Sequence, residues 1–326
     1  MILAFESSCD DTCVAIVKNG RVLANAIGSQ ILVHRKTQGV VPEVAAREHA
    51  KNIKTVLETC LKDAKLKLSD ITAIACANQP GMTGCLLVGS TFASALAALL
   101  NLPIYEVNHK LGHVYSCFLE RERQEIKFPF IALSVSGGHN ELYLVEAVGK
   151  HTMLGSTLDD AAGEAYDKVA KMLGLNYPGG PDISRVALEG NTKAFSFPCP
   201  LPHQKFNFSF SGLKTNVKYK IQELSKPLNP PQVSDIAASF QHCINTNLVK
   251  KTLKAVQAHQ AQQVHLVGGV SANLDLRKKM QLACTPIEVL TPQEFSFCTD
   301  NAAMIGVVAE LLAPKHQLSA GDMVQV

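Results

Sequence analysis

Two histidines of the chain are spaced so that they could bind one metal ion. His109 and His113 are four residues apart, and residues at this spacing lie on the same face of a helix. Both imidazoles can then reach a single ion, at about 2.0–2.1 Å for a zinc–nitrogen bond. Asp300 is a candidate third ligand, because its carboxylate lies just ahead of the apolar run 302–308, where it is expected to be a helix N-cap. The alternative from these residues alone is an ordinary helix face and an ordinary cap.

Polar and glycine-rich turns offer a second kind of chemistry, the binding of phosphate. Glycine lets backbone amides approach an anion closely, and consecutive N–H groups form an anion-binding nest. One pair of glycines is usually only a turn, but several at strand ends predict an adenine nucleotide in a cleft between two domains. The turns are Ser7-Ser8-Cys9-Asp10-Asp11-Thr12, Ser136-Gly137-Gly138-His139, Tyr177-Pro178-Gly179-Gly180-Pro181 and Gly268-Gly269-Val270-Ser271-Ala272-Asn273.

An acidic segment lies between these turns, at residues 156–168. It contains a helix start followed by an apolar stripe, so helix capping and a solvated face explain most of its charge. Asp167 is singled out, because it stands one helical turn after Gly163 and shortly before a glycine-rich turn. The four carboxylates are Asp159, Asp160, Glu164 and Asp167.

Length and composition indicate a packed globular protein. The 326 residues suffice for two domains of about 100–200 residues, with 47% hydrophobic and 18% charged residues. The net charge of +3 is weak, so contact with nucleic acid would require a local basic patch. The ten cysteines contain no C-x-x-C pair, which predicts free thiols and a cytoplasmic location.

The sequence predicts neither a secretory signal nor a membrane span. Glu6 and Asp10 interrupt the first apolar run. The longest uncharged stretch, residues 71–105, is broken by glycines, prolines and Asn101, which leaves a helix at residues 84–100. About 17 residues is the lower limit for a bilayer span, so a buried core helix is predicted instead.

The first third of the chain alternates strands and helices, which predicts an α/β fold. Strands are expected at Ile2–Glu6, 13–18 and 21–27, with a type I′ turn at Asn19-Gly20. Pro42 begins an amphipathic helix. Its apolar stripe consists of Val44, Ala45, His49, Ile53, Val56, Leu57 and Cys60. The further elements are a strand at 71–76, the helix at 84–100, a strand at 103–107 and the helix that carries both histidines.

The strand–turn–strand pattern then recurs. Residues 130–136 and 141–145 flank one polar turn. A third copy of the turn chemistry follows residues 264–267, and a helix is expected after it. This repetition predicts two similar α/β domains that face each other across a cleft. The charged, proline-rich residues 226–231 are expected to be a surface connection.

Nine motifs occur in an order similar to that of the TsaD family, the tRNA adenosine threonylcarbamoyltransferases, formerly described as O-sialoglycoprotein endopeptidases. The resemblance spans essentially the whole chain. The motifs are Glu6-Ser7-Ser8-Cys9-Asp10-Asp11-Thr12, Val40-Val41-Pro42-Glu43, His109-x-x-x-His113, Ser136-Gly137-Gly138-His139, Asp159-Asp160-Ala161-Ala162-Gly163-Glu164-Ala165-Tyr166-Asp167-Lys168, Tyr177-Pro178-Gly179-Gly180-Pro181, Phe208-Ser209-Phe210-Ser211-Gly212-Leu213-Lys214-Thr215, Gly268-Gly269-Val270-Ser271-Ala272-Asn273 and Cys298-Thr299-Asp300-Asn301.

The resemblance implies the actin-like ATPase fold, with two ribonuclease-H-like domains around a nucleotide cleft. The implied first domain is residues 1–126, completed by a C-terminal helix at about 300–326, and the second is residues 127–299. The implied reaction transfers threonylcarbamoyl from threonylcarbamoyl-AMP to the exocyclic amine of the adenosine 3′ of the anticodon. The implied substrates are tRNAs that read codons starting with A.

The resemblance also implies site residues. The metal ligands would be His109, His113 and Asp300, and Asp10 would lie near the reacting group. Asp10 or His139 would accept the proton from the amine. Two histidines and a carboxylate suit iron, zinc or manganese, and we expect one divalent ion, Fe²⁺ ahead of Zn²⁺. The residues that would hold the adenylate donor are Ser134, Val135, Ser136, Gly137, Gly138, Asp167, Gly180 and Asn273.

The implied partners are tRNA, the dimerising paralogue TsaB and the small ATPase TsaE, with a homodimer expected for the isolated chain. The helix at residues 42–66 is expected to form part of the surface for the paralogue. Departures from the family pattern occur at Asp11, Leu111, Asn140 and residues 36–39. None of them removes an implied ligand.

Three other functions compete with this interpretation. A zinc metalloprotease or glycoprotease has its general-base Glu directly after the first His, where this chain has Lys110. A small-molecule kinase on the same fold would explain the glycine turns but leaves the His pair and Asp300 unexplained. A non-catalytic scaffold, like the shortened paralogue, would lack the metal ligands, and this chain retains all three.

Overall fold

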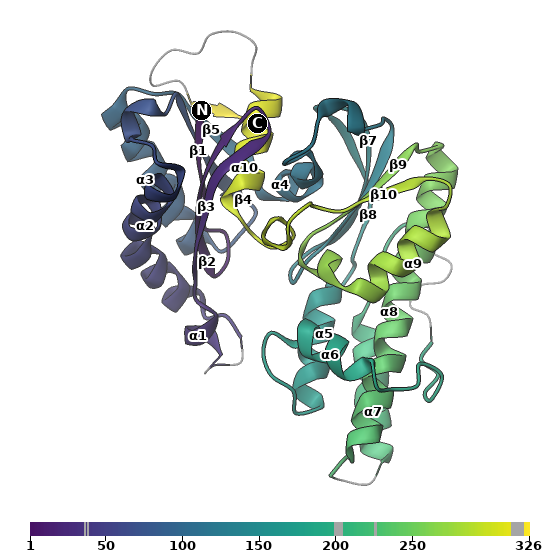
Figure 1. Ribbon diagram of the computed structural model, residues 1–326. Helices are drawn as coiled ribbons and strands as arrows, with labels where there is room; N and C mark the ends of the chain where they lie inside the picture. The colour runs from purple at the N-terminus through teal and green to yellow at the C-terminus, as the bar shows by residue number, and fades with distance from the viewer. Residues whose placement is uncertain (36, 38, 199–204, 225–226, 314–322) are drawn as a thin grey trace. The chain divides into compact units, whose positions relative to one another are not determined.

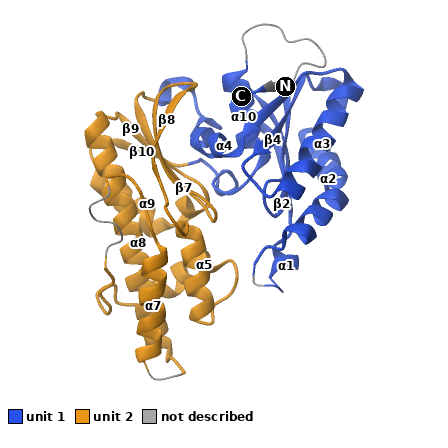
Figure 2. Ribbon diagram, turned by 180° about the vertical axis from the view of Figure 1, so that it is seen from behind, with its two compact units in different colours: residues 1–126, 292–326 blue, residues 127–291 orange. Residues whose placement is uncertain are grey.

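The chain divides into two compact units, which Figure 2 shows in different colours. The computed structural model describes residues 1–35, 37, 39–198, 205–224, 227–313 and 323–326. The first unit contains residues 1–126 and 292–326, and the second contains residues 127–291. The expected second domain ended at residue 299, whereas residues 292–299 belong to the first unit.

The first unit is organised around a mixed six-stranded sheet (Figure 1). Its order is β11-β5-β4-β1-β2-β3. The β1–β2 and β2–β3 pairs are antiparallel, whereas the β1–β4, β4–β5 and β5–β11 pairs are parallel. The strands are β1 (Ile2–Glu6), β2 (Asp11–Lys18), β3 (Arg21–Ser29), β4 (Ala73–Gln79), β5 (Ile104–Asn108) and β11 (Met323–Gln325).

The second unit repeats this strand arrangement in a five-stranded sheet. Its order is β10-β9-β6-β7-β8, with antiparallel β6–β7 and β7–β8 pairs and parallel β6–β9 and β9–β10 pairs. The strands are β6 (Phe130–Val135), β7 (Asn140–Ala147), β8 (Lys150–Ser156), β9 (Gln263–Val267) and β10 (Glu288–Leu290). The sheets confirm the predicted mixed α/β class, and the repeated pattern in the sequence corresponds to this shared order.

Two of the predicted turns are confirmed. Asn19 and Gly20 have φ values of 53° and 74°, as a type I′ turn requires, and connect the paired residues Lys18 and Arg21. The predicted turn after β9 is followed by a helix, as expected, since β9 leads into a 3₁₀ helix (Gly269–Ala272) and α9 (Leu274–Cys284). The neighbours of β9, β6 and β10, are parallel to it, and parallel strands require crossover connections.

Helices cover the first sheet on both faces. Figure 1 shows α2 and α3 on one side and α10 on the other. The helices are α1 (Ile31–His34), α2 (Pro42–Ala64), α3 (Thr83–Leu100), α4 (His109–Tyr115) and α10 (Ala302–Leu312). Short 3₁₀ turns occur at Leu68–Asp70, Ser116–Phe118, Arg123–Glu125 and Phe295–Phe297.

The predicted stripe of α2 is buried except at one position. Ala45, His49, Ile53, Val56, Leu57 and Cys60 are buried, as predicted. Val44 is 37% exposed, so its assignment to the stripe is wrong. Adjacent helical residues differ by about 100° around the axis, which turns Val44 away when Ala45 faces the sheet.

The prediction that residues 84–100 form a buried core helix is wrong. Only Cys85, Gly89, Ala93 and Ala97 of α3 are buried. They are spaced four residues apart and form one narrow stripe, on which small side chains allow close packing. A Cβ on Gly89 would lie 2.2 Å from Ser7 Oγ, so the first polar loop depends on this close approach.

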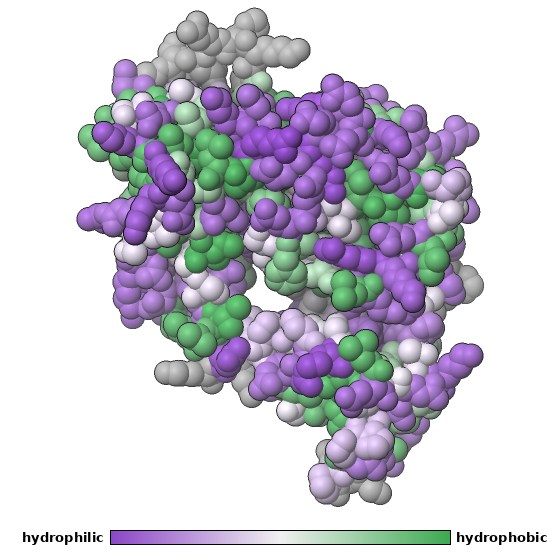
Figure 3. All heavy atoms as spheres, viewed as in Figure 1, coloured by the Kyte–Doolittle hydropathy of each residue, from purple (hydrophilic) through white to green (hydrophobic). Residues whose placement is uncertain are grey.

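The rest of α3 is exposed although it is apolar, with Leu87 58% and Leu99 80% exposed. By length and composition, α3 is the one helix of the described residues that could cross a membrane, with a mean hydropathy of 1.8. Core helices of globular proteins meet the same criterion. On the face shown in Figure 3, hydrophobic residues form small patches among hydrophilic ones.

The expected C-terminal helix is shorter than predicted. α10 ends at Leu312, and Met323–Gln325 form an edge strand beside β5. Ala313 has a ψ of 136°, outside the helical region. The next residue in the sequence is Pro314, and a residue that precedes proline disfavours the α conformation.

In the second unit, five helices pack with the sheet around one apolar core. They are α5 (Ala162–Met172), α6 (Gly179–Ala187), α7 (Ser211–Glu223), α8 (Pro230–His259) and α9. The expected surface connection at 226–231 is partly helical, since Asn229 caps α8 and Pro230 begins it, while Lys226 lies outside the described residues. The nine described cysteines are free thiols, and Lys36 and Gln38 of the family departures also lie outside that set.

Candidate functional site

The two histidines are positioned by the transition from β5 to α4. Asn108 ends the strand and caps the helix, because its side-chain oxygen accepts a hydrogen bond of 2.9 Å from the Lys110 amide. His109 is therefore the first helical residue, and His113 lies one turn further on. Both are buried, and their ring centroids are 4.9 Å apart.

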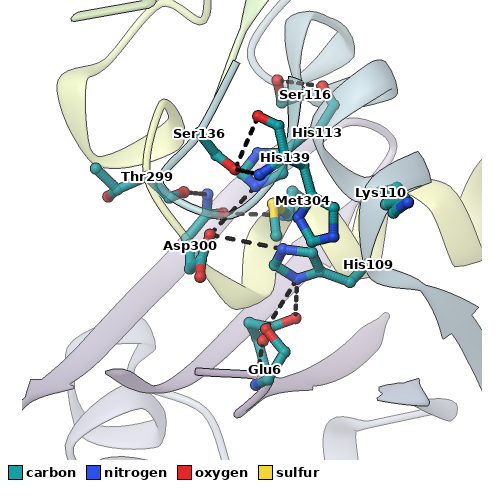
Figure 4. Close-up of polar contacts among 12 residues, drawn as sticks. Glu6, His109, Lys110, His113, Ser116, Ser136, His139, Thr299, Asp300 and Met304 are labelled. Carbon is teal, nitrogen blue, oxygen red and sulfur yellow. Dashed lines mark hydrogen bonds and ion pairs between the residues drawn. The ribbon is translucent and has the colours of Figure 1, made fainter. Parts of the chain in front are cut away.

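Asp300 faces these rings instead of capping α10. The predicted N-cap is off by one residue, because Asn301 accepts the hydrogen bond from Met304 N, at 2.9 Å. Asp300 Oδ1 lies 3.2 Å from His113 Nε2 and 3.7 Å from His109 Nε2 (Figure 4). Since the neighbouring asparagine caps the helix, the aspartate is available as a ligand.

A glycine brings the two helices close enough for this arrangement. A Cβ on Gly112 would lie 2.9 Å from Met304 Cγ and 3.2 Å from Ile305 Cδ1. α4 therefore packs directly on the first turns of α10, the helix that Asp300 precedes. Residues 187 positions apart in the chain, His113 and Asp300, meet as a result.

The three side chains suit a divalent metal ion. One ligand atom from each of His109, His113 and Asp300 lies within 4.8 Å of the others. The buried His113 Nδ1 has no hydrogen-bond partner among the described residues, while Nε2 of both rings points to the Asp300 carboxylate. Two imidazoles and one carboxylate are ligands that iron, zinc and manganese accept.

Glu6 orients His109 from the opposite side of the ring (Figure 4). The Glu6 carboxylate is buried and its Oε2 lies 2.9 Å from His109 Nδ1, with Ser8 Oγ at 3.1 Å from the same nitrogen. Burial alone would lower the pKa of His109, but the charges of Glu6 and Asp300 and the hydrogen bond to Glu6 raise it to about 9. A carboxylate that holds the second nitrogen fixes the ring orientation of a metal-binding histidine.

Glu6 was not predicted as a site residue. A signal for it exists in the sequence, because it is a carboxylate at the end of a strand with no other charged residue. β1, β4 and β5 are parallel, so Glu6 and Asn108 lie at the same edge of the sheet. Sites in open α/β sheets form at the carboxyl ends of the strands.

Asp10 lies in the bend between β1 and β2, as predicted, and adds negative charge to this region. Burial and the charges of Asp10 and Asp300 raise the pKa of the Cys9 thiol. Burial is also the main cause that raises the pKa of Asp11 to about 6, and Asp10 and Asp300 contribute to the shift. The cluster therefore lies in an anionic environment that favours a bound cation.

In the second unit, the turn between β6 and β7 presents glycine backbone to open space. Ser134 and Val135 end β6, and Ser136 N donates a hydrogen bond of 2.8 Å to His139 O. An added Cβ on Gly137 or Gly138 would meet no atom within 4 Å. An anion can therefore approach these glycines, and His139 is half-buried beside them.

Two further glycines allow other segments to lie against this turn. A Cβ on Gly163, in the first turn of α5, would lie 2.6 Å from Ser136 O. Gly268 follows β9 with a φ of 85°, and its Cβ would lie 2.4 Å from Val135 O. The N-terminus of α5 and the turn after β9 thus pack directly against the turn at Ser136.

Asn273 and Asp167 connect the remaining elements of the predicted donor site. Asn273 caps α9, and its Nδ2 donates to Gln241 Oε1 at 2.8 Å and to Ser184 Oγ, on α6, at 3.0 Å. Asp167 Oδ1 accepts a hydrogen bond of 2.7 Å from Gly179 N. The stretch at 177–181 was expected to be a turn at a strand end, which is wrong, because Gly179 and Gly180 begin α6 after Pro178.

The other carboxylates of the acidic segment have structural partners, as the capping interpretation predicts. Asp159 accepts hydrogen bonds from the amides of Phe210 and Ser211, at the start of α7. Asp160 pairs with Lys168 and Lys214, at 3.0 and 2.7 Å.

The predicted site residues thus fall into two groups. The first unit brings together His109, His113 and Asp300 and carries Asp10 in the adjoining loop. The second unit carries His139 and all residues predicted to hold the donor, on elements that contact one another.

The two mixed α/β units define the fold class, the actin-like ATPase fold. HypF from T. kodakarensis superposes with a TM-score of 0.63 at 12% identity, over 94% of this chain and 47% of that chain. Component A of the (R)-2-hydroxyglutaryl-CoA dehydratase of Acidaminococcus fermentans gives a TM-score of 0.55 at 14% identity, over 93% of this chain and 95% of that chain. At such identities the similarity describes the fold alone.

The family follows from the sequence comparisons. The TsaD profile, described as tRNA N6-adenosine threonylcarbamoyltransferase, matches residues 21–307. The tRNA N6-adenosine threonylcarbamoyltransferase of Geotalea uraniireducens (strain Rf4) is 48% identical over 327 residues, covering 99% of this chain and 94% of that protein. This chain belongs to the TsaD family.

Proposed function

We propose that this protein transfers a threonylcarbamoyl group from threonylcarbamoyl-AMP to the exocyclic amine of an adenosine in tRNA. The acceptor would be the adenosine 3′ of the anticodon in tRNAs that read codons starting with A. The observation that carries the proposal is the His109, His113 and Asp300 cluster in a chain of the TsaD family. A protease mechanism is disfavoured, because Lys110 follows the first histidine and cannot act as the general-base carboxylate.

His109, His113 and Asp300 would hold one divalent ion, Fe²⁺ or Zn²⁺, with Glu6 holding the second nitrogen of His109. When bound, such an ion supplies Lewis-acid polarisation of oxygen atoms on the donor. The protein supplies the rigid geometry, since both rings are buried and Glu6 fixes one of them.

The adenylate donor would lie against the glycine turns of the second unit. Two observations support this assignment. The space over Gly137 and Gly138 is open, and a hydrogen bond connects Asp167 to the start of α6. Backbone amides there could donate hydrogen bonds to the phosphate. The other residues expected to hold the donor lie on or next to β6, α6 and α9, which belong to the same set of contacting elements: Ser134, Val135, Gly180 and Asn273. Correct positioning of donor and amine alone can lower the barrier by up to ~7–11 kcal/mol.

The mixed anhydride of the donor is already activated, with AMP as its leaving group. The amine nitrogen would attack the carbamoyl carbon, the bond to the phosphate oxygen would break, and the amine proton must pass to a base. Asp10 and His139 are the candidates for this base. Asp10 is half-buried in the bend of an anionic loop and lies outside the apolar cores, which supports its assignment.

The proposed partners are tRNA, TsaB and TsaE, in the cytoplasm, with a homodimer for the isolated chain. The exposed apolar side chains of α2 and α3 offer a surface for the paralogue TsaB. These side chains include Val44, Leu87 and Leu99, at 37%, 58% and 80% exposure. Because the net charge is only +3, robust tRNA modification by this chain and the donor alone, at low enzyme concentration, would contradict the need for partners.

The test is a single-turnover reaction with preformed threonylcarbamoyl-AMP, tRNA, this protein and both partner proteins. Mass spectrometry of the anticodon-loop nucleosides should show the threonylcarbamoyl adduct on the adenosine 3′ of the anticodon. A strain depleted of the protein should lose the same nucleoside. Transfer to no tRNA nucleoside, or unchanged nucleosides after depletion, would refute the function.

Asp10→Asn tests the candidate base in the same reaction. The substitution preserves size, so the variant should keep its melting temperature, its metal and its nucleotide affinity. The transfer rate should fall by ~10²-fold or more, because an amide cannot accept the proton. Asp70→Asn is the matched control, since Asp70 only caps a 3₁₀ turn on the surface. A near-normal rate of a folded, metal-loaded Asp10→Asn protein would remove Asp10 from the catalytic residues.

A further inference from the structure

A pocket of about 470 Å³ lies on the second unit between α5 and α7. Figure 2 shows these two helices side by side. Lysines dominate its lining, and we call it the basic pocket. Its lining residues include Lys168, Lys171 and Met172 of α5 and Lys214, Lys218 and Tyr219 of α7. None of these residues belongs to the predicted metal or donor sites.

All four lysines line the same pocket. Lys168 and Lys171 are three residues apart on α5, and Lys214 and Lys218 are four apart on α7. Residues at these spacings are neighbours on a helix surface, where like charges repel each other. An anionic ligand in the pocket would offset this repulsion.

Carboxylates of the protein neutralise only part of this charge. Asp160 pairs with Lys168 and Lys214, and Glu164 pairs with Lys168 at 2.6 Å. Lys171 and Lys218 are exposed and form no ion pair within the part of the chain that the structure describes. The pocket therefore retains two positive charges that face solvent.

An aromatic ring accompanies these cations. Tyr219 is 58% exposed, and the apolar side chain of Met172 lies in the same lining. Basic grooves with exposed aromatic side chains are typical of proteins that bind nucleic acid, because the lysines contact phosphates and the ring stacks on a base. The weak net charge of +3 means that tRNA binding requires a local patch of this kind.

The geometry points to a second contact for RNA. We propose that the basic pocket binds the sugar-phosphate backbone of the tRNA substrate, with Tyr219 stacking on an unpaired base. This inference rests on the proposed function for the identity of the RNA. The pocket residues of α5 lie about 7–14 Å along the helix axis from Gly163, which abuts the Ser136 turn. The pocket would therefore hold nucleotides other than the acceptor adenosine itself.

The test compares Lys171→Gln/Lys218→Gln with the matched control Lys254→Gln/Lys278→Gln, which removes two exposed lysines elsewhere in the second unit. tRNA affinity is measured with the full chain and both partners at several salt concentrations. Loss of two phosphate contacts should weaken binding about tenfold or more and reduce the slope of log Kd against log salt by about 1–2. Tyr219→Leu should weaken binding about tenfold with an unchanged salt slope.

Single-turnover transfer separates this proposal from the proposed function. At saturating tRNA the Lys171→Gln/Lys218→Gln protein should react at the normal rate, while the tRNA concentration for half-maximal rate rises. If the unmodified protein transfers threonylcarbamoyl to tRNA and both double variants bind tRNA equally, the pocket proposal fails alone. If Lys171→Gln/Lys218→Gln instead loses affinity for AMP or inorganic phosphate and keeps its tRNA affinity, the pocket is a small-anion site and the proposal is also refuted. Failure of the unmodified protein to act on tRNA would refute the proposed function.

Discussion

The candidate metal cluster and the glycine turns occupy equivalent edges of two similarly ordered sheets, but they are built differently. In the first unit, the carboxyl ends of β1 and β5 carry the buried side chains of Glu6 and His109. In the second unit, the carboxyl ends of β6 and β9 lead into backbone at Ser136 and Gly268. One strand arrangement thus carries a candidate site made of side chains and a candidate site made of main chain.

The difference predicts how each site responds to substitution. The cluster depends on side-chain atoms that are held from two directions, so small chemical changes should matter there. The turns depend on the absence of side chains over Gly137 and Gly138, so added bulk should matter there. Three variants test this contrast and a fourth, outside both sites, serves as a reference, beginning with the variant for which we expect the largest effect.

The largest effect should come from His109→Ala/His113→Ala. Loss of two of three ligands should reduce the metal content from one ion per chain to nearly none, because one carboxylate cannot hold a first-row ion against water. Metal analysis of the purified proteins measures this. His242→Ala is the control, since His242 lies in α8 of the second unit. Equal metal content in the double variant and the control would show that the cluster is not a metal site.

Glu6→Gln changes one charged group in the same cluster without removing a ligand. The amide cannot hold His109 Nδ1 as strongly as a carboxylate, so metal affinity should fall by about 10–100-fold. Competition with a chelator of known affinity gives the value. Glu106→Gln, in the same sheet, should leave the affinity unchanged. If both variants bind metal equally, Glu6 does not orient the site.

Gly137→Val should affect the second unit through bulk alone. The new side chain would occupy open space, so the protein should fold normally. Nucleotide affinity should fall by about 10–100-fold, the value of one or two hydrogen bonds to a charged group. Calorimetry measures the affinity. Gly163→Val is the contrasting variant, since its Cβ would lie 2.6 Å from Ser136 O and should lower stability first. Normal affinity of a folded Gly137→Val protein would place the nucleotide elsewhere.

The smallest effect should come from Asp159→Asn. Asp159 is exposed and supports the start of α7 without belonging to either site. Burial opposes ionisation, but hydrogen bonds from Ser209, Phe210 and Ser211 lower the pKa of Asp159. Loss of the carboxylate should reduce the free energy of unfolding by about 0.5–1 kcal/mol at neutral pH, the lower part of the range for helix caps.

The pH dependence distinguishes this role from a packing role. A folded-state pKa below the unfolded value adds stability above the unfolded pKa, and this is lost as the pH falls through the folded pKa. The difference between the wild-type protein and Asp159→Asn should therefore shrink below about pH 4. Chemical denaturation at pH 7 and at acid pH tests this, and a constant difference would contradict the assignment.

Features that depend on neighbouring residues could be predicted from the sequence. The i, i+4 spacing places His109 and His113 on one face, and Asn19-Gly20 forms the expected turn because both residues tolerate positive φ. The strands that were predicted also occur close to their expected bounds, since β-rich composition and turn residues act over a few positions, whereas β8, β10 and β11 were not predicted.

Features that depend on distant segments were decided by the tertiary structure. Whether Asp300 or Asn301 caps α10 could not be read from the sequence, because both residues are good caps. The exposure of α3 depends on what packs against it, and an apolar composition does not reveal that. Glu6 became a site residue only because β1 lies near the strand that precedes His109.

Asp300 and the two histidines show the limit most clearly. The sequence by itself determined their residue types and the helix that pairs the rings. The contact between Asp300 and the histidines required the packing of α4 on α10 at Gly112. Asp300 is 187 residues from His113 in the sequence. Helix period and turn chemistry are short-range effects, whereas contacts between distant segments follow from sheet order and helix packing, which the whole chain sets together.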